Sequence, residues 1–419
     1  CPVTLSRAIS KEISKRSQAE KLCAGVFALV ALWQVARTTL GGGTDTSVFD
    51  GCTALASISV AEGNGNFVSK DGILYGKQAE SDALKTLIMA PAGLEVTGGA
   101  LQLPATITSI GAKAFINNVT LKSVAFSGEL NEPLTIGANA FDGCKELATV
   151  AFPAKLTEIG NNAFANCAKL SAITIPNTVA KIGNNAFENC VALESVAFDD
   201  GNDTVAVTLG KSVFANTAVT SMTLPERMSN IPARALNGMY KLQSLVLPTS
   251  LTKLYEIFGI GYSEGSNYSI SSITFNGTSN LVSIEDKALQ NVANLTSFTI
   301  PDTVTTIKTQ AFYRSGLQSV VIPASVSKMS IKVFNDCPNL TTAVFECETI
   351  GEDFDQAFYR CPSLTSVTLP SKLTKLPYGL FEECHNLQSL TIPKTVKHIS
   401  TDVFKNTYSL KTVTFETYT

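Results

Sequence analysis

The sequence predicts an α/β repeat fold: a solenoid whose short strands stack into a curved, mostly parallel sheet, with short helical or turn segments opposite. Three observations support this prediction: a strand pattern that recurs along most of the chain, a period in the twenties, and an apolar residue that returns after each strand. The period outweighs the length of 419 residues, which alone would suggest two or three globular domains. Function must therefore be sought on an extended surface, because each repeat contacts only its neighbours.

The recurring strand pattern is Leu-x-x-Φ-x-Φ, where Φ is an apolar residue. After a first interval of 66 residues, successive copies stand 22 to 28 residues apart. This spacing is typical of a leucine-rich repeat solenoid, which we expect to fill residues 44–419 with about 14 to 16 repeats and an irregular element at 61–100. The first position of the pattern falls at Leu55, Leu121, Leu147, Leu170, Leu193, Val219, Leu242, Ile270, Leu295, Leu317, Leu340, Leu364, Leu387 and Leu410.

Each repeat is expected to continue from its strand into a short apolar pair and then a turn. Pro closes the strand in eight copies, because its missing N–H removes a ladder donor. Gly follows the apolar pair in several repeats, as at Gly183, but Lys308 and Ser400 occupy equivalent places, so a positive φ is not required there. The turn phrase Asn-Asn-Ala-Phe-x-Asn-Cys stands at 161–167 and 184–190. One turn of helix with this Phe facing inward would fill the core opposite the strand.

The ten cysteines follow the repeat. Other repeats place Thr217, Met239, Val292 or Thr407 in the slot that seven cysteines occupy, which indicates a small, mostly buried packing position. Equivalent side chains on successive strands lie roughly 4.8 Å apart, wider than the Cβ separation that a disulfide prefers. We therefore expect a ladder of reduced thiols. Its members each stand three residues after the turn Phe or its equivalent: Cys52, Cys144, Cys167, Cys190, Cys337, Cys361 and Cys384.

Residues 1–43 do not follow the repeat. Apolar residues keep near-helical spacing from Leu5 to Trp33, and three glycines at 41–43 make a plausible helix stop, so we expect an N-terminal helical cap. Two alternatives stay open: a signal peptide, because basic residues precede the apolar stretch, or a lipidated Cys1. The uninterrupted apolar stretch of twelve residues is too short to span a bilayer.

The turn phrase at 159–167 and the strand phrase at 170–176 make a resemblance specific. Together with the stretches 66–75 and 84–91, which resemble an irregular hairpin-like element, these phrases are similar to the BspA-like, treponemal-type leucine-rich repeat family of bacterial and protozoan surface proteins. The resemblance covers roughly residues 44–419. It implies a cell-surface or extracellular solenoid with adhesive or interaction roles, and it names no ligand.

Several motifs resemble chemical sites but lack their context. Gly261–Gly265 reads G-x-S-x-G, yet no strand and helix of a hydrolase surround Ser263. The two histidines, His385 and His398, lie five or more repeats away, beyond the hydrogen-bond contact that a triad needs. The acidic clusters at 199–203 and 352–355 lack the ligand loop of an EF-hand. We therefore expect no enzyme activity, no cofactor and no metal.

Two surfaces are candidates for binding a partner. The insertion 259–269 holds Tyr262 and Tyr268 among small polar residues, a mixture suited to adaptable contacts. The outward positions of the strands form an uncharged, hydroxyl-bearing ramp that includes Ser244, Ser272 and Ser297. Disordered bulges and merely soluble strand residues would explain the same patterns.

The leading functional hypothesis is a non-enzymatic surface protein that mediates adhesion or protein–protein interaction. The expected partner is an extracellular or host protein, with a glycan as a further possibility. The net charge of −3 gives no reason to expect nucleic acid, and membrane contact would need a lipid or an N-terminal anchor. The alternative is a structural spacer or stalk that presents another module away from a membrane.

Overall fold

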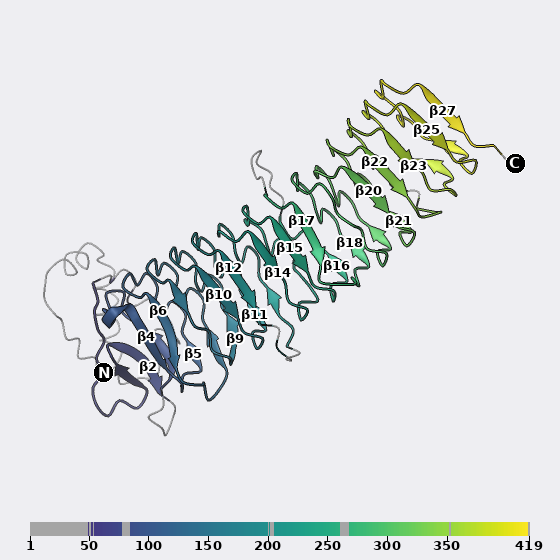
Figure 1. Ribbon diagram of the computed structural model, residues 1–419. Coiled ribbons are helices and arrows are strands. Elements are labelled where there is room, and N and C mark those ends of the chain that lie inside the picture. Colours follow the sequence, from purple (N-terminus) through teal and green to yellow (C-terminus); the bar gives the residue numbers. More distant parts are fainter. Residues whose placement is uncertain are drawn as a thin grey trace, which may run out of the picture.

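A computed structural model describes residues 49, 52, 54–77, 84–199, 201, 205–259, 268–351 and 353–417 of the chain. Within them the protein is a parallel β-solenoid, and each turn of the solenoid, which holds one repeat, is a rung. The rungs stack into an elongated body with an antiparallel element near the N-terminal end and β27 (Thr412–Phe415) at the other (Figure 1). The expected cap at 1–43 lies outside the described residues. No α-helix occurs among the described residues, so the predicted α/β character is wrong.

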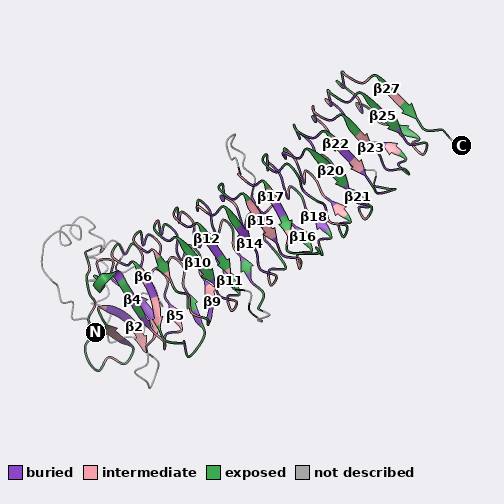
Figure 2. Ribbon diagram, viewed as in Figure 1, coloured by how far each residue is buried: buried purple, intermediate pink, exposed green. Residues whose placement is uncertain are grey.

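The wide face of the solenoid is built from the recurring strand pattern. Neighbouring strands pair in parallel with equivalent residues opposite each other, as in Ile173 opposite Val196. Burial alternates along most of these strands, as in β10, so their Φ positions point into the core and their x positions outward (Figure 2). The strands of this face are β4 (Ala100–Pro104), β6 (Ser123–Ser127), β8 (Thr149–Val150), β10 (Ala172–Ile175), β12 (Ser195–Phe198), β14 (Ser221–Thr223), β15 (Ser244–Leu247), β17 (Ser272–Phe275), β20 (Ser319–Ile322), β22 (Thr342–Phe345), β23 (Ser366–Thr368), β25 (Ser389–Ile392) and β27.

A narrow second ladder follows the strand-closing prolines. The carbonyl of each of the eight prolines accepts the amide three residues on, as Pro176 accepts Val179, so the proline starts the bend toward the next strand. The predicted role of proline as a strand terminator is confirmed. The short strands are β5 (Ser109–Ile110), β7 (Leu134–Ile136), β9 (Leu156–Ile159), β11 (Lys181–Ile182), β13 (Thr208–Leu209), β16 (Lys253–Leu254), β18 (Ser283–Ile284), β19 (Thr306–Ile307), β21 (Lys328–Met329), β24 (Lys375–Leu376) and β26 (His398–Ile399).

The narrow ladder begins on an antiparallel element. Strand β1 (Phe67–Lys70) forms a hairpin with β2 (Ile73–Lys77), and β2 pairs antiparallel with β3 (Leu84–Met89). Strand β3 then pairs in parallel with β5, which passes the pairing on to the repeats. A short 3₁₀ turn, η2 (Thr97–Gly99), leads into β4. This element occupies the place of the irregular hairpin that the resemblance implies.

The third edge of each rung is a left-handed turn, not the expected turn of helix. In 161–167, Asn162 and Asn166 have φ of 53° and 60°, and equivalent pairs recur along the stack. The amides of Asn162, Phe164 and Asn166 donate to carbonyls of the next rung at 2.8–2.9 Å, whereas the intervening amides donate within the turn. Because half of the amides bond between rungs, the turn adds a third ladder that a helix could not provide.

The turn Phe residues form a column through the core. Successive rings of Phe115, Phe141, Phe164, Phe187 and Phe214 stack with centroids 4.8–5.6 Å apart and interplanar angles of at most 12°. All of these side chains are buried, as are the equivalent Leu and Phe residues at 236, 258 and 289. The predicted core role of the turn Phe is confirmed, and the rings gain offset stacking in addition to burial.

The cysteine slot is a hydrogen-bonding position as well as a packing one. The thiols of Cys144, Cys167 and Cys190 donate to the carbonyl of the Phe on the preceding rung at 3.0–3.2 Å. The hydroxyl of Thr407 donates to the equivalent carbonyl at 2.8 Å. Burial raises the pKa of Cys144 to about 12, so its thiol stays protonated. The expectation of buried, reduced thiols holds for the ladder cysteines from Cys144 to Cys384, whereas Cys52 is only half-buried.

Candidate functional site

The wide face repeats the same outward positions from β4 to β27. Its outward positions alternate with core positions, and Ser297 is exposed while Ser244 and Ser272 are half-buried. The three predicted hydroxyls therefore lie on the same face, on β15, on β17 and on the segment that follows them in the stack. The structure brings them together along neighbouring rungs, as the alternation of the strand pattern implies.

In the part of the chain that the structure describes, the strands of this face form five separate sheets, and one of the breaks lies beside β17. Residues 297–300 keep the strand pattern, but they belong to no sheet of the described chain. Among the described residues, no backbone hydrogen bond joins 271–276 to 296–301. In a parallel sheet, alternate residues turn both backbone groups toward the next strand. The N–H and C=O groups of Ile273 and Phe275 therefore face this gap without a ladder partner.

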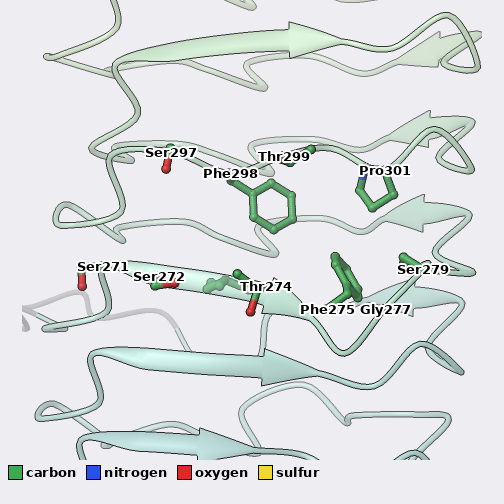
Figure 3. A pocket seen from close by; sticks show the side chains of 11 residues that line it. Ser271, Ser272, Thr274, Phe275, Gly277, Ser279, Ser297, Phe298, Thr299 and Pro301 are labelled. Carbon is green, nitrogen blue, oxygen red and sulfur yellow. The ribbon is translucent and has the colours of Figure 1, made fainter.

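An unusually large core residue stands at the interruption. Phe298 occupies the first Φ position, which holds smaller aliphatic side chains such as Val196, Ile273 and Val320 in other repeats. Its ring is 7% exposed and packs against Phe312 with centroids 5.8 Å apart. Figure 3 shows this ring between its own segment and β17. The bulk of Phe298 distinguishes this break from those between β12 and β14 and between β23 and β25, where no phenylalanine takes this position.

A hollow of about 340 Å³ opens at this point of the face (Figure 3). Its walls combine hydroxyl groups with the two phenylalanine rings, and no charged side chain lines it. The lining residues are Ser271, Ser272, Ile273, Thr274, Phe275, Gly277, Ser279, Ser297, Phe298, Thr299 and Pro301. Ser272 and Ser297, which the strand pattern singled out, stand on its opposite sides.

A carboxylate lies near one end of the hollow. Asn276, between the lining residues Phe275 and Gly277, donates to Glu226 at 3.2 Å, and Thr249 donates to the same carboxylate through its amide and hydroxyl at 2.7–3.2 Å. Although partial burial opposes ionisation, the hydrogen bonds from Thr249 hold the pKa of Glu226 below its usual value. Glu226 is therefore a fixed negative charge that ties together the ends of three rungs.

The chemistry of the hollow suits a neutral ligand. Hydroxyl groups and unpaired backbone groups offer hydrogen bonds, and the phenylalanine rings offer an apolar contact. Among the residues that the structure describes, no three His, Cys, Asp or Glu side chains gather where they could hold a metal ion. The hollow can thus bind and orient, and its lining holds no group suited to proton transfer near neutral pH.

Tyr268 is a correction to the sequence analysis. It was grouped with Tyr262 as an aromatic residue of an exposed insertion, but its side chain is 2% exposed. Its hydroxyl donates to the carbonyl of Phe258, and its ring lies 5.3 Å from those of Phe258 and Tyr240. Burial raises its pKa to about 12. Tyr268 closes the core where the insertion rejoins the stack, while Tyr262 lies outside the described residues.

The remaining chemical motifs fall on turns, on the short strand β26 or partly outside the described residues. His385 stacks on Tyr408 with ring centroids 5.3 Å apart and shares a hydrogen bond with the carbonyl of Asn406. His398 lies exposed on β26. Ser263 lies in a segment that is not described, and the acidic clusters at 199–203 and 352–355 are described only in part.

The ladders, the phenylalanine column and the turns define the class of protein: a parallel β-solenoid built from leucine-rich repeats. The chain belongs to the BspA-type leucine-rich repeat family, whose model matches residues 99–208, 259–354 and 347–419 in six copies. The predicted family is thereby confirmed. No curated protein sequence matches the chain.

The chain is similar to several solved structures. A leucine-rich repeat protein from Bacteroides ovatus is 21% identical, with 81% of this chain and 86% of that chain covered and a TM-score of 0.55. A leucine-rich cell surface protein from Faecalibacterium prausnitzii is 20% identical, with coverages of 85% and 97% and a TM-score of 0.37. The T. pallidum leucine-rich repeat protein is 24% identical, with coverages of 46% and 78% and a TM-score of 0.31.

Among the residues that the structure describes, no helix has the length and apolar character needed to cross a bilayer.

Proposed function

We propose that the protein is a non-enzymatic, cell-surface or secreted leucine-rich repeat protein that mediates adhesion or protein–protein interaction through its solenoid surface. The observation that carries this proposal is the hollow on the wide face, which joins hydroxyls, unpaired backbone groups and aromatic rings without a charged or catalytic side chain. The partner is an extracellular or host protein, with a glycan as the other class to be tested.

Binding to the wide face has a direct test. The protein is screened against extracellular matrix proteins and glycans, and each hit is measured again with a Ser272→Glu/Ser297→Glu variant. Two charges in a neutral hollow add repulsion and desolvation cost, so affinity is expected to fall by about tenfold or more. The matched control is Ser195→Glu/Ser366→Glu, which adds the same charges on exposed positions of β12 and β23. Equal losses in both variants would contradict a site at the hollow.

The insertion 259–269 is a second proposed contact. Tyr262 is its remaining aromatic candidate, because Tyr268 is committed to the core. Tyr262→Ala is expected to weaken the partner found in the screen while leaving the solenoid folded, since Tyr268 and the strands are untouched. Unchanged affinity would remove the insertion from the site.

A structural spacer is the alternative function. The regular stack of rungs from β4 to β27 favours it, because such a body holds its two ends apart (Figure 1). A spacer predicts that charged substitutions on the wide face change no binding, whereas the interaction protein predicts a localised loss. The two variants above therefore discriminate between the two functions.

A further inference from the structure

A different edge of the solenoid carries residues that neither the strand pattern nor the hollow explains. The phrase Ala-Phe-Tyr-Arg occurs twice, at 311–314 and 357–360, in turns that are two rungs apart. Tyr313 and Tyr359 are half-buried on the turn edge, and Arg314 and Arg360 are exposed there. We call these four residues the Tyr-Arg edge.

The two arginines occupy a left-handed position of the turn. Arg314 and Arg360 have φ of 53° and 58°, in the left-handed region that Asn and Gly tolerate better than a long side chain. Other rungs place Asn166, Asn189 and Asn216 at this same turn position. At 314 and 360, arginine therefore replaces the asparagine of these rungs on the turn edge.

The arginines are held in one orientation. Each guanidinium lies over the ring of the preceding tyrosine, 5.1 Å from the centroid. The Nε of Arg314 lies 3.6 Å from Asp336, and the Nε of Arg360 donates to Glu383 at 3.0 Å. The two arginine side chains nevertheless remain 59% and 52% exposed, so their Nη groups stay reachable. Side chains fixed in this way lose less entropy when a partner binds.

We propose that the Tyr-Arg edge is a protein-binding surface whose partner presents two carboxylates about 10 Å apart. That separation follows from two rungs at roughly 4.8 Å each. Arg and Tyr are the residue types that dominate binding energy at protein interfaces, and arginine binds carboxylates through paired N–H groups. Because Asp336 and Glu383 cancel the two positive charges, the edge favours a protein surface of mixed charge over a polyanionic glycan.

This surface extends the proposed function but does not rest on the hollow, which lies on the wide face. The test uses a displayed library of random 12-residue peptides, selected on the full chain at low salt. Enriched peptides are expected to carry paired acidic residues, and to bind an Arg314→Gln/Arg360→Gln variant about tenfold more weakly. Arg360→Lys should bind the peptides more tightly than the glutamine variant and more weakly than the unmodified chain. Lysine keeps the positive charge but lacks the paired N–H groups of the guanidinium.

Two controls separate this inference from the proposed function. Lys181→Gln removes an exposed cation that is also paired across rungs, with Glu158, and should leave the selected peptides bound. The Ser272→Glu/Ser297→Glu variant should also bind them normally. The inference is overturned if no peptide is enriched, if the enriched peptides bind the arginine variant equally, or if heparin competes with them and lacks affinity for the variant, which would assign the edge to a glycan.

Discussion

The rungs between Gly111 and Gly210 and the rungs between Lys308 and Ser400 build the same turn in two ways. In the first region, glycine follows the apolar pair and lets consecutive turns touch: a Cβ on Gly160 would lie 2.6 Å from the backbone of Gly137. In the second region that position carries a side chain except at Gly351, and Lys308 pairs with Glu285 of the preceding rung. Phenylalanine rings stack 4.8–5.6 Å apart in the first region and 5.2–6.1 Å apart in the second.

The side-chain contacts on the turn edge also differ between the two regions. In the first region, Asn216 donates to Asn189 and Asn189 donates to Asn166 through their side-chain amides at 2.8 and 3.0 Å. Asn166 ends this ladder on the carboxylate of Asp142 at 2.8 Å. In the second, Arg314, Asp336, Arg360 and Glu383 take the same left-handed positions and pair by charge. The core pattern therefore does not fix the residue types on the turn edge. Different rungs can carry different binding surfaces on this edge.

The largest expected effect is on the phenylalanine column. Phe164→Ala should destabilise its rung by about 3–5 kcal/mol, the usual range for a buried Phe. Phe381→Ala should cost less, because its ring neighbours lie 5.8 and 6.1 Å away, compared with 4.9 and 5.3 Å for Phe164. Hydrogen exchange of individual rungs measures both, since a long repeat array has no single unfolding transition. Equal costs would show that ring spacing does not distinguish the regions.

The glycine contact should matter in one region alone. Gly160→Ala is expected to cost about 1–3 kcal/mol, because its Cβ would overlap the backbone of Gly137. Gly351→Ala is the matched control, since a Cβ there would meet nothing closer than the carbonyl of Ser327 at 3.9 Å, and should be neutral or slightly stabilising. Rung-resolved hydrogen exchange again gives the readout, and similar losses at both sites would undo the comparison.

The thiol hydrogen bond should be common to both regions. Cys167→Val removes the donor to Phe141 and should cost about 0.5–1.5 kcal/mol more than Cys167→Thr, because Thr407 shows that a hydroxyl reaches the equivalent carbonyl. The same pair of substitutions at Cys384, which donates to Phe358 at 3.1 Å, should give a similar difference. Denaturation midpoints with matched alkylation controls test this, and a preference for Val at either site would speak against the bond.

Acid should destabilise the first rungs of the second region, around the Lys308–Glu285 pair, before it destabilises the first region. Although burial opposes ionisation, the Lys308 ammonium holds the pKa of Glu285 below its ordinary value. The pair therefore stabilises the folded chain fully above the ordinary carboxyl pKa of about 4.3, and this contribution is lost as pH falls through the lowered folded value. As the pH falls through this value, amide hydrogen exchange should accelerate in the rungs of residues 284–308 before it does in the rungs of residues 136–183. Glu285→Gln should abolish the difference, and an unchanged profile would exclude the pair as its cause.

Much of the fold could be predicted because one side-chain pattern controls it. Alternation along the strand fixes which residues face the core, and the interchange of Cys with Thr identified the buried slot. The turn could not be predicted in the same way, because its left-handed residues include Asn162, Ser212 and Lys332, and no single residue type marks them. Backbone hydrogen bonds between successive rungs determine the left-handed conformation of the turn. These bonds can be recognised only when neighbouring turns are placed side by side.

The candidate site was only partly predictable for the same reason. Ser272 and Ser297 followed from alternation, but the hollow depends on how Phe298 packs beside the next strand. Tyr268 was misplaced because its neighbours Asn and Ser are typical of loops, whereas the space left by Phe258 and Tyr240 determines its burial. The Tyr-Arg edge was present in the sequence as a repeated four-residue phrase, yet its meaning required the left-handed φ values and the charge partners.

The buried thiols that donate to phenylalanine carbonyls can report which rungs of the solenoid have separated. Cys144, Cys167 and Cys190 sit one rung apart, and each becomes accessible to an alkylating reagent only when its own rung separates from the one before it. Under a pulling force that unravels the stack from one end, the cysteines would be modified in sequence order. The pattern of modified thiols would then record how far the disruption had travelled.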